Sequence, residues 1–260
     1  MFVPRKRADG DARAVESLFG KGLSDYEIGK RTGIPRTTVQ RWRTRGAPPP
    51  ADVPLTWRPP CPQSYSYLLG IYLGDGYLAN SAAPSPVLEI SLDPAYPEIV
   101  NECSTAIQRV VATRVKASRR TTPKGEAIRL VATSRFWPLA FPQHGPGKKH
   151  ERTIVLTSWQ QDVVGRFPRP FLRGLIHSDG CRVVNRFRAD LASGRREYAY
   201  PRYFFTNLSA DIQGLFCASC ERLGIRWTQS SHKNISVADR RSVAILDGFV
   251  GSKAYAGGGT

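Results

Sequence analysis

Apolar and polar positions follow the same order twice along the chain. The stretches YLLGIYLGDGYL (67–78) and FLRGLIHSDGCR (171–182) each form an apolar run with helical spacing that ends in Asp-Gly. Their aspartates, Asp75 and Asp179, lie 104 positions apart. After each run, strand-like and helical periods alternate in the same way. An internal duplication is a stronger signal than either motif alone, so the sequence predicts two similar halves.

Each half is predicted to contain seven elements in the order αββαββα. After the first motif we expect strands near 76–80 and 87–92, a helix near 95–112, strands at 113–120 and 127–133, and a helix from about 135. After the second motif we expect strands at 181–188 and 198–206, a helix at 209–223, strands at 226–231 and 234–238, and a helix at 240–250. We assign the halves to residues 65–150 and 151–260. The predicted fold class is α+β.

A proline-rich segment separates these halves from a smaller N-terminal unit. Residues 46–64 hold seven prolines in nineteen positions, and proline both fixes φ and removes a backbone donor. We therefore expect an extended, semi-rigid linker there. Residues 1–45 are predicted to form a small all-α domain of three short helices. Ser24 followed by Glu27 fits a capping box at the second helix, and Gly33 allows a turn at positive φ before the third.

The spacing in this unit resembles the helix-turn-helix of resolvases and transposases. Gly29 takes the small-residue position between two helices, Gly33 the turn position and Val39 the buried position of the last helix. The resemblance implies that the outward face of the last helix contacts base edges and phosphates in a major groove. That face carries Arg36, Thr37, Thr38, Gln40, Arg41 and Arg43. A three-helix unit for protein interaction is the alternative.

Charge is unevenly distributed along the chain. The formal net charge is +17, and chains this basic usually bind a polyanion, of which nucleic acid is the commonest. Lys and Arg outnumber Asp and Glu by eleven to five in residues 1–45, by eight to six in 65–145 and by eighteen to nine in 146–260. Two basic units around a nearly neutral one favour two nucleic-acid contacts. The alternative is a proteome that is basic throughout.

Neither a membrane segment nor a disulfide framework is expected. No run approaches the ~18 apolar residues of a membrane span, and the basic start of the chain has no apolar signal-peptide region. We expect a cytoplasmic, nucleoid-associated protein. The five cysteines are odd in number and irregularly spaced, which is typical of reduced thiols. Cys217 and Cys220 form a CxxC inside an apolar helical pattern with no second pair, which favours buried helix positions over metal ligands.

Small residues on the two motif helices explain why each helix ends in a carboxylate. They recur at i and i+4, which lets two helices pack closely. These residues are Gly70, Gly74, Gly174 and Ser178. Close packing would bring Asp75 and Asp179 together at two helix C-termini, which already carry partial negative charge. Like-charge repulsion makes this pair costly unless cations are bound, and oxygen ligands suit Mg²⁺.

The two motifs resemble those of the LAGLIDADG homing endonucleases, in the single-chain form with two motif copies. The resemblance covers roughly residues 65–250 and matches at the glycine and terminal Asp-Gly positions. It implies a monomer whose two sheets form a saddle over double-stranded DNA, with the motif helices at the pseudo-twofold axis. It also implies that Asp75 and Asp179 bind a catalytic divalent metal, and we place Gly74 and Ser178 in the same metal site. Leu73 and His177 occupy the family's other acidic position.

Strand periodicity offers an independent prediction of the saddle. In each half, basic residues alternate with apolar ones, so that each set shares one sheet face. The basic sets are Arg114, Lys116 and Arg120 in the first half, and Arg182, Arg186 and Arg188 in the second. A row of cations on a two-stranded ribbon suits a major groove. The alternative is an ordinary solvated sheet face.

The family resemblance also implies a basic residue near each scissile phosphate, just after the last strand of each half. The matching positions are Arg135 in the first half, and Arg240 or Arg241 in the second. Arginine stabilises a phosphorane but is a poor proton donor. Lys148 and Lys149, in the segment between the halves, fit either a phosphate-gripping loop or a solvated connector. His144, His150 and His177 are candidate general bases, with structural roles as the alternative.

Two functions fit these patterns. The first is site-specific, Mg²⁺-dependent cleavage of double-stranded DNA, with the helix-turn-helix adding affinity or targeting. The second is a non-cleaving transcription regulator that uses the same fold as a DNA clamp. Bacterial sporulation regulators that resemble this family combine the two module types in the opposite order. An RNA-splicing maturase fits the fold and charge, but no feature of the sequence favours it.

Overall fold

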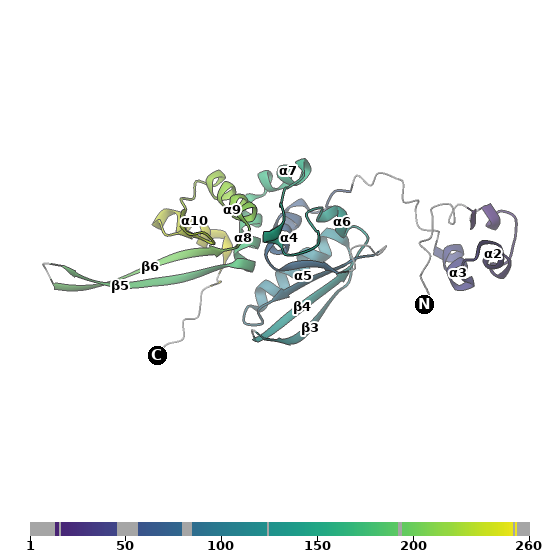
Figure 1. Cartoon of the computed structure of the whole chain (residues 1–260), viewed down its shortest axis with the longest axis horizontal. Coiled ribbons are helices and arrows are strands. Elements are labelled where there is room, and N and C mark those ends of the chain that lie inside the picture. The colour runs from purple at the N-terminus through teal and green to yellow at the C-terminus, as the bar shows by residue number, and fades with distance from the viewer. Residues whose placement is uncertain are drawn as a thin grey trace. The chain divides into compact units, whose positions relative to one another are not determined.

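The computed structural model describes residues 14–15, 17–45, 57–79, 85–123, 125–191, 194–251 and 253. The chain divides into two compact units, Met1–Thr56 and Trp57–Thr260, which are described separately (Figure 1). Residues 1–13 and the greater part of the predicted linker, 46–56, lie outside the described residues. No helix in the described ranges is long and apolar enough to cross a membrane.

The N-terminal unit contains helices α2 (Asp25–Thr32) and α3 (Arg36–Arg45). The predicted capping box is present, because Ser24 Oγ accepts from the Glu27 backbone and Glu27 accepts from the Ser24 backbone. Gly33 ends α2 with φ of 71°. A Cβ on Gly29 would lie 2.9 Å from the carbonyl oxygen of Ile34, so only glycine fits that close approach. The buried residues of the unit are Val15, Ile28, Ile34, Val39 and Trp42.

The larger unit contains two halves of the same architecture. The first half contains α4 (Pro62–Asp75), β1 (Gly76–Ala79), β2 (Val87–Leu92), α5 (Pro97–Val111), β3 (Val115–Thr122), β4 (Gly125–Thr133) and α6 (Trp137–Ala140). The second half contains α8 (Pro168–Asp179), β5 (Gly180–Leu191), β6 (Gly194–Thr206), α9 (Ala210–Arg222), β7 (Thr228–Ser231), β8 (Asn234–Val237) and α10 (Arg240–Val250). Both sheets are antiparallel and have matching strand orders, β1-β2-β4-β3 and β5-β6-β8-β7. The predicted duplicated αββαββα fold is confirmed.

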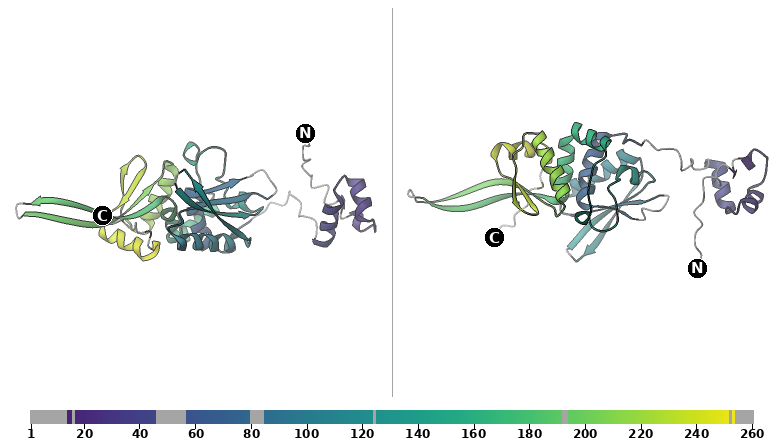
Figure 2. Two further views of the ribbon diagram at one scale, coloured as in Figure 1. Left: turned by 90° about the horizontal axis from the view of Figure 1, so that it is seen from below. Right: turned by 45° about the horizontal axis from the view of Figure 1, so that its top comes forward.

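The halves differ from the prediction in two places. The connection between them contains a short 3-10 helix, η1 (Lys149–Glu151), and helix α7 (Ser158–Arg166), which the sequence analysis did not anticipate. Strands β5 and β6 are 12 and 13 residues long, against 4 and 6 for their counterparts β1 and β2. Figures 1 and 2 show β5 and β6 as a two-stranded ribbon that extends beyond the rest of its sheet.

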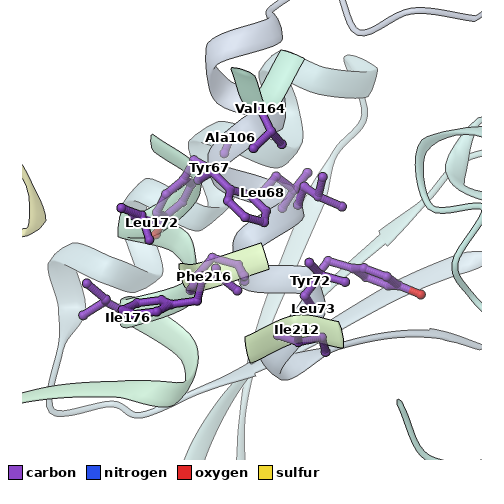
Figure 3. Packing of buried hydrophobic residues seen from close by; sticks show 14 of the residues in the cluster. Tyr67, Leu68, Tyr72, Leu73, Ala106, Val164, Leu172, Ile176, Ile212 and Phe216 are labelled. Carbon is purple, nitrogen blue, oxygen red and sulfur yellow. The ribbon is translucent and has the colours of Figure 1, made fainter. Parts of the chain in front are cut away.

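Helices α4 and α8 lie side by side at the centre of this unit, and one hydrophobic core spans both halves. Every residue of α4 from Tyr65 to Leu73 is buried, which explains why its sequence has no polar face. A Cβ on Gly70 would lie 2.8 Å from the backbone nitrogen of Leu175, and one on Gly174 would lie 2.9 Å from that of Ile71. The two helix backbones are therefore in direct contact. Figure 3 shows large side chains of the two helices, such as Tyr67 and Leu172, in one cluster with residues of neighbouring helices, such as Phe216.

Candidate functional site

Asp75 and Asp179 are the last residues of α4 and α8, the two helices in backbone contact. A Cβ added to Gly74 would lie 2.7 Å from Asp179 Oδ2, so the Asp179 carboxylate reaches across to α4. Both aspartates keep partial contact with solvent. Two carboxylates from opposite halves therefore share one site at the adjoining C-termini of the helices.

The environment of these carboxylates favours their protonated forms. Burial raises the pKa of Asp75 to about 7, and the negative charge of Asp179 adds to this effect. Burial also raises the pKa of Asp179, while a hydrogen bond from Asn207 Nδ2 to Asp179 Oδ2 (2.7 Å) opposes the rise. Two ammonium groups, those of Lys149 and Lys253, lower both pKa values. Ionising both carboxyls at this site is therefore costly unless cationic groups lie next to them.

Lys149 and Lys253 cap the C-termini of the two motif helices in equivalent ways. The acceptors are Tyr72 O (2.6 Å) and Gly74 O (2.9 Å) for Lys149, and Ile176 O (3.1 Å), His177 O (2.7 Å) and Ser178 O (3.1 Å) for Lys253. Ammonium donors at these carbonyls satisfy groups that a helix leaves without partners, and they offset the negative end of its dipole. Burial lowers the pKa of Lys149 to about 8 and also lowers that of Lys253, while the carboxylates oppose both shifts.

The basic residues beside the carboxylates, Lys149 and Lys253, are not Arg135 and Arg240, which were predicted to lie near the scissile phosphates. Arg135 is exposed and lies over the Phe136 ring, 5.0 Å from its centroid, and Arg240 is exposed at the start of α10. Neither is among the charges that act on Asp75. In each half, the lysine that contacts the end of the motif helix lies further along the chain than the predicted arginine. It follows α6 in the first half and α10 in the second. Lys149 and Lys253 are 104 positions apart, the same spacing as the aspartates, and this repeat was the missed signal.

The candidate histidines differ in their surroundings. His177 is buried, accepts from Tyr67 OH at Nδ1 (3.0 Å) and donates from Nε2 to Val250 O (2.9 Å). Burial lowers the pKa of His177 to about 4, so it is neutral at pH 7 and joins α4, α8 and α10. His144 contacts Tyr72 OH through Nδ1 (3.1 Å). His150 lies 3.9 Å from Glu151.

A cavity of about 520 Å³ opens beside the carboxylates. Its lining includes His144, Lys148, Lys149 and His150 from the segment between the halves. Asp179 and Asn207 also line it. Lys148 is exposed and its ammonium lies 3.5 Å from a Glu151 carboxylate oxygen. Asn207 could not be predicted as a site residue, because an Asn that follows a strand gives no distinctive pattern.

In the first half, the predicted basic strand residues lie on the uncovered sheet face. Val115 and Ala117 pair with the buried Ala132 and Leu130, so that the alternating residues Lys116 and Arg120 point away from the core. Arg129 pairs with Ser118 and therefore joins this face, where it forms an ion pair with Glu89. Arg114 is exposed just before β3.

In the second half, the predicted orientation is wrong for Arg182. Arg182 pairs across the sheet with the buried Tyr203 and therefore faces the helices, where it forms an ion pair with Asp247 of α10 (2.8 Å). Arg186 and Arg188 share its strand face by period 2, but they are exposed on the part of the ribbon that extends beyond the sheet. The opposite face contains Arg196 and Arg202, because they pair with Ala189 and Val183. The alternation of residue types along a strand separates the two faces of the sheet but does not show which face the helices cover. Here the contact between Arg182 and α10 shows it.

In the N-terminal unit, most predicted DNA-contacting residues are exposed on α3. These are Arg36, Thr37, Gln40 and Arg41, whereas Thr38 is half-buried. Arg43 differs, because its guanidinium donates to Asp25 Oδ1 (2.7 Å) and Leu23 O (2.7 Å) and lies over the Phe19 ring. Arg43 therefore stabilises the unit itself.

The carboxylate site offers only oxygen ligands to a metal ion. In the described part of the chain, no cluster of three or more His, Cys, Asp or Glu residues could hold one. Two carboxylates with carbonyl and water oxygens suit Mg²⁺, which usually keeps several waters in protein sites. The donor set therefore fits a hard divalent cation. Gly74 O and Ser178 O, which accept hydrogen bonds from Lys149 and Lys253, would also be ligands of the cation.

All five cysteines are free thiols, with Cys217 and Cys220 buried on α9.

Comparison with known proteins gave structural matches only. No family model matches the chain, and no curated protein does. The homing endonuclease I-WcaI bound to its DNA recognition sequence is similar at 12% identity and a TM-score of 0.48, over 82% of this chain and 93% of that one. I-DmoI in complex with DNA and Mn is similar at 13% identity and a TM-score of 0.47, over 74% of this chain and 98% of that one. Full-length DUF199/WhiA from Thermatoga maritima is similar at 15% identity and a TM-score of 0.45, over 77% of this chain and 58% of that one.

Proposed function

We propose that this chain is a monomeric, LAGLIDADG-type DNA endonuclease that binds a specific double-stranded site and cleaves both strands with Mg²⁺. One observation carries the proposal. Two carboxylates from a duplicated fold share a site at adjoining helix C-termini, between sheets with arginine and lysine on their uncovered faces. A structural core alone gives no reason to place two like charges together in a half-buried position.

Asp75 and Asp179 would hold the cation, with Gly74 O and Ser178 O as further oxygen donors. Bound Mg²⁺ would lower the pKa of a water molecule and neutralise charge on the phosphate. The chain's own residues then have separate roles. Asn207 orients the Asp179 carboxylate through its 2.7 Å hydrogen bond. Lys149 and Lys253 supply positive charge at the site, where DNA phosphates would add negative charge.

A non-cleaving DNA clamp is the second candidate function, and one observation favours it. Lys149 and Lys253 already donate hydrogen bonds to the terminal carbonyls of both helices and oppose the charge of both carboxylates. Two ammonium groups and two carboxylates neutralise one another without any metal ion. In this reading the sheets bind DNA and the N-terminal unit acts as a second, helix-turn-helix contact.

Selection of a bound DNA site followed by incubation with Mg²⁺ distinguishes the two functions. Purified full-length protein would select sites from random duplexes, and the selected duplex would be incubated with Mg²⁺, with EDTA as the control. Double-strand breaks that appear only with Mg²⁺ support the endonuclease. Stable binding without any nick in either strand contradicts cleavage and supports the clamp.

Adjacent arginines on β3 test which sheet face contacts DNA. Arg120 shares the uncovered face with Lys116, whereas Arg119 pairs with Ile128 on the opposite face. Arg120→Ala should weaken DNA binding about three- to tenfold and reduce the slope of log affinity against log salt by about one, since one phosphate contact is lost. Arg119→Ala removes the same charge and should leave both quantities unchanged. Equal effects of the two changes in filter-binding titrations would contradict the saddle.

Divalent cation affinity should depend on pH near neutrality. Asp75 has a raised pKa of about 7, so below this pH the carboxyl is mainly protonated and cannot bind a cation. Affinity for Mn²⁺ should therefore rise about tenfold per pH unit below pH 7. Titration calorimetry with Mn²⁺ from pH 5.5 to 8.5 measures this directly. An affinity that does not change over this range would contradict a role for Asp75 as ligand.

A further inference from the structure

A second cavity, of about 760 Å³, lies at the opposite end of the two motif helices from the carboxylates. It is lined by the first turns of α4 and α8, together with residues of α5, the end of α7 and Phe249 of α10. Since α4 is 14 residues long, about 20 Å of helix separates this cavity from Asp75. None of the functions discussed above uses it.

The cavity gathers positive charge. Its lining contains four arginines and one carboxylate, that of Glu102. Arg173 pairs with Glu102 at 2.8 Å. The other three, Arg109, Arg166 and Arg169, are exposed, and no carboxylate of the described residues forms an ion pair with them. Three guanidinium groups with no carboxylate partner among the described residues thus line one cavity, and guanidinium binds phosphate through two parallel hydrogen bonds.

The rest of the lining is largely apolar and aromatic. Tyr67, Phe167, Leu223 and Phe249 contribute apolar surface, and the Arg166 guanidinium lies 5.5 Å from the Phe167 ring centroid. Cavities of about 300–1,000 Å³ with apolar walls and a few polar groups are typical of small-molecule sites. This lining suits a ligand with a flat, apolar body and one strongly anionic end.

Helix ends of both polarities border the cavity. Helices α4 and α8 begin there, each with proline in its first turn. The last turns of α5, α7 and α10 contribute Arg109, Arg166 and Phe249 to the same lining. Because the dipoles of N-terminal and C-terminal helix ends oppose each other, the positive charge of the cavity comes from its arginines.

We propose that this cavity binds a small organic phosphate of nucleotide size, with the phosphate held by Arg109, Arg166 and Arg169 and the flat body packed on Phe167 and Phe249. A duplex is too wide to enter a cavity of this volume. The DNA-binding faces proposed above belong to the sheets. The site therefore does not depend on cleavage or on the choice between the two functions.

Titration calorimetry on the full-length protein tests this proposal, with AMP, adenosine and inorganic phosphate as probes. AMP should bind with one-to-one stoichiometry and at least tenfold more tightly than either adenosine or phosphate, because both parts of the site then contribute. Arg166→Ala and Arg169→Ala should each weaken AMP binding about tenfold. Arg119→Ala, which removes one exposed arginine elsewhere, should not. Thermal melting should be unchanged in all three variants.

Several results would overturn the proposal. Absence of AMP binding, or an affinity for phosphate equal to that for AMP, would leave no organic ligand to propose. An equal loss in Arg119→Ala would mean that AMP responds only to net charge. Displacement of AMP by a selected DNA duplex would place AMP on the DNA-binding faces, whereas unchanged AMP affinity in the presence of duplex supports a separate cavity.

Discussion

Asp75→Asn is expected to abolish cleavage of a bound DNA site while leaving DNA affinity within about threefold. The change removes one negative charge and one oxygen ligand from the carboxylate pair and keeps the shape of the side chain. Loss of a metal ligand at a phosphoryl-transfer site should lower the cleavage rate at least about 10³-fold. Binding should persist because the sheet faces and α3 are unaffected. Because the two carboxylates share one site, cleavage of both strands should be lost.

Single-turnover cleavage and equilibrium binding, measured on the same duplex, check this expectation. Asp162→Asn is the matched control, because Asp162 is exposed on α7 and away from the carboxylates. It should cleave at the wild-type rate. An Asp75→Asn protein that still cuts both strands at that rate would remove the basis of the proposed mechanism. Loss of binding together with cleavage would instead show that Asp75 supports the fold.

The carboxylate pair could be predicted from sequence because it follows from local chemistry. Gly70 and Gly174 indicated close helix packing. When two closely packed helices both end in Asp, their carboxylates must lie next to each other. The strands after each motif were also predictable, because one face of each sheet is buried and apolar residues therefore alternate with polar ones along the strands. The limits of β2 and α10 in the structure are those predicted.

The errors arose where long-range packing decides the outcome. The orientation of Arg182 depends on Asp247, 65 residues later, and no local pattern shows which strand face α10 covers. Lys253 lies beyond α10 in the sequence, and its contact with the end of α8 is a tertiary one that no local pattern indicates. The extension of β5 and β6 beyond their sheet could not be predicted. Strand ends are predicted from the alternation of buried and exposed side chains, and a ribbon that extends beyond the core has no buried face to produce this alternation.

Gly174→Ala is expected to lower the free energy of unfolding of the larger unit by about 3 kcal/mol, the upper range for overpacking a close-packed core. The added Cβ would collide with backbone atoms of α4, including the Ile71 nitrogen at 2.9 Å and the Gly70 Cα at 3.0 Å. Backbone atoms cannot rotate aside as a side chain can, so the helices must separate or the unit must deform. Separation would also move Asp179 away from Asp75.

Gly214→Ala provides the matched control for this prediction. Gly214 lies within α9, and a Cβ there would meet no atom within 4 Å. The same substitution should therefore raise the free energy of unfolding by about 0.5–1 kcal/mol, because alanine has the higher helix propensity. Urea titrations followed by tryptophan fluorescence measure both changes. The opposite signs are the decisive result, since Gly174→Ala as stable as the wild type would mean that α4 and α8 are not in backbone contact, and the carboxylate pair would lose its structural support.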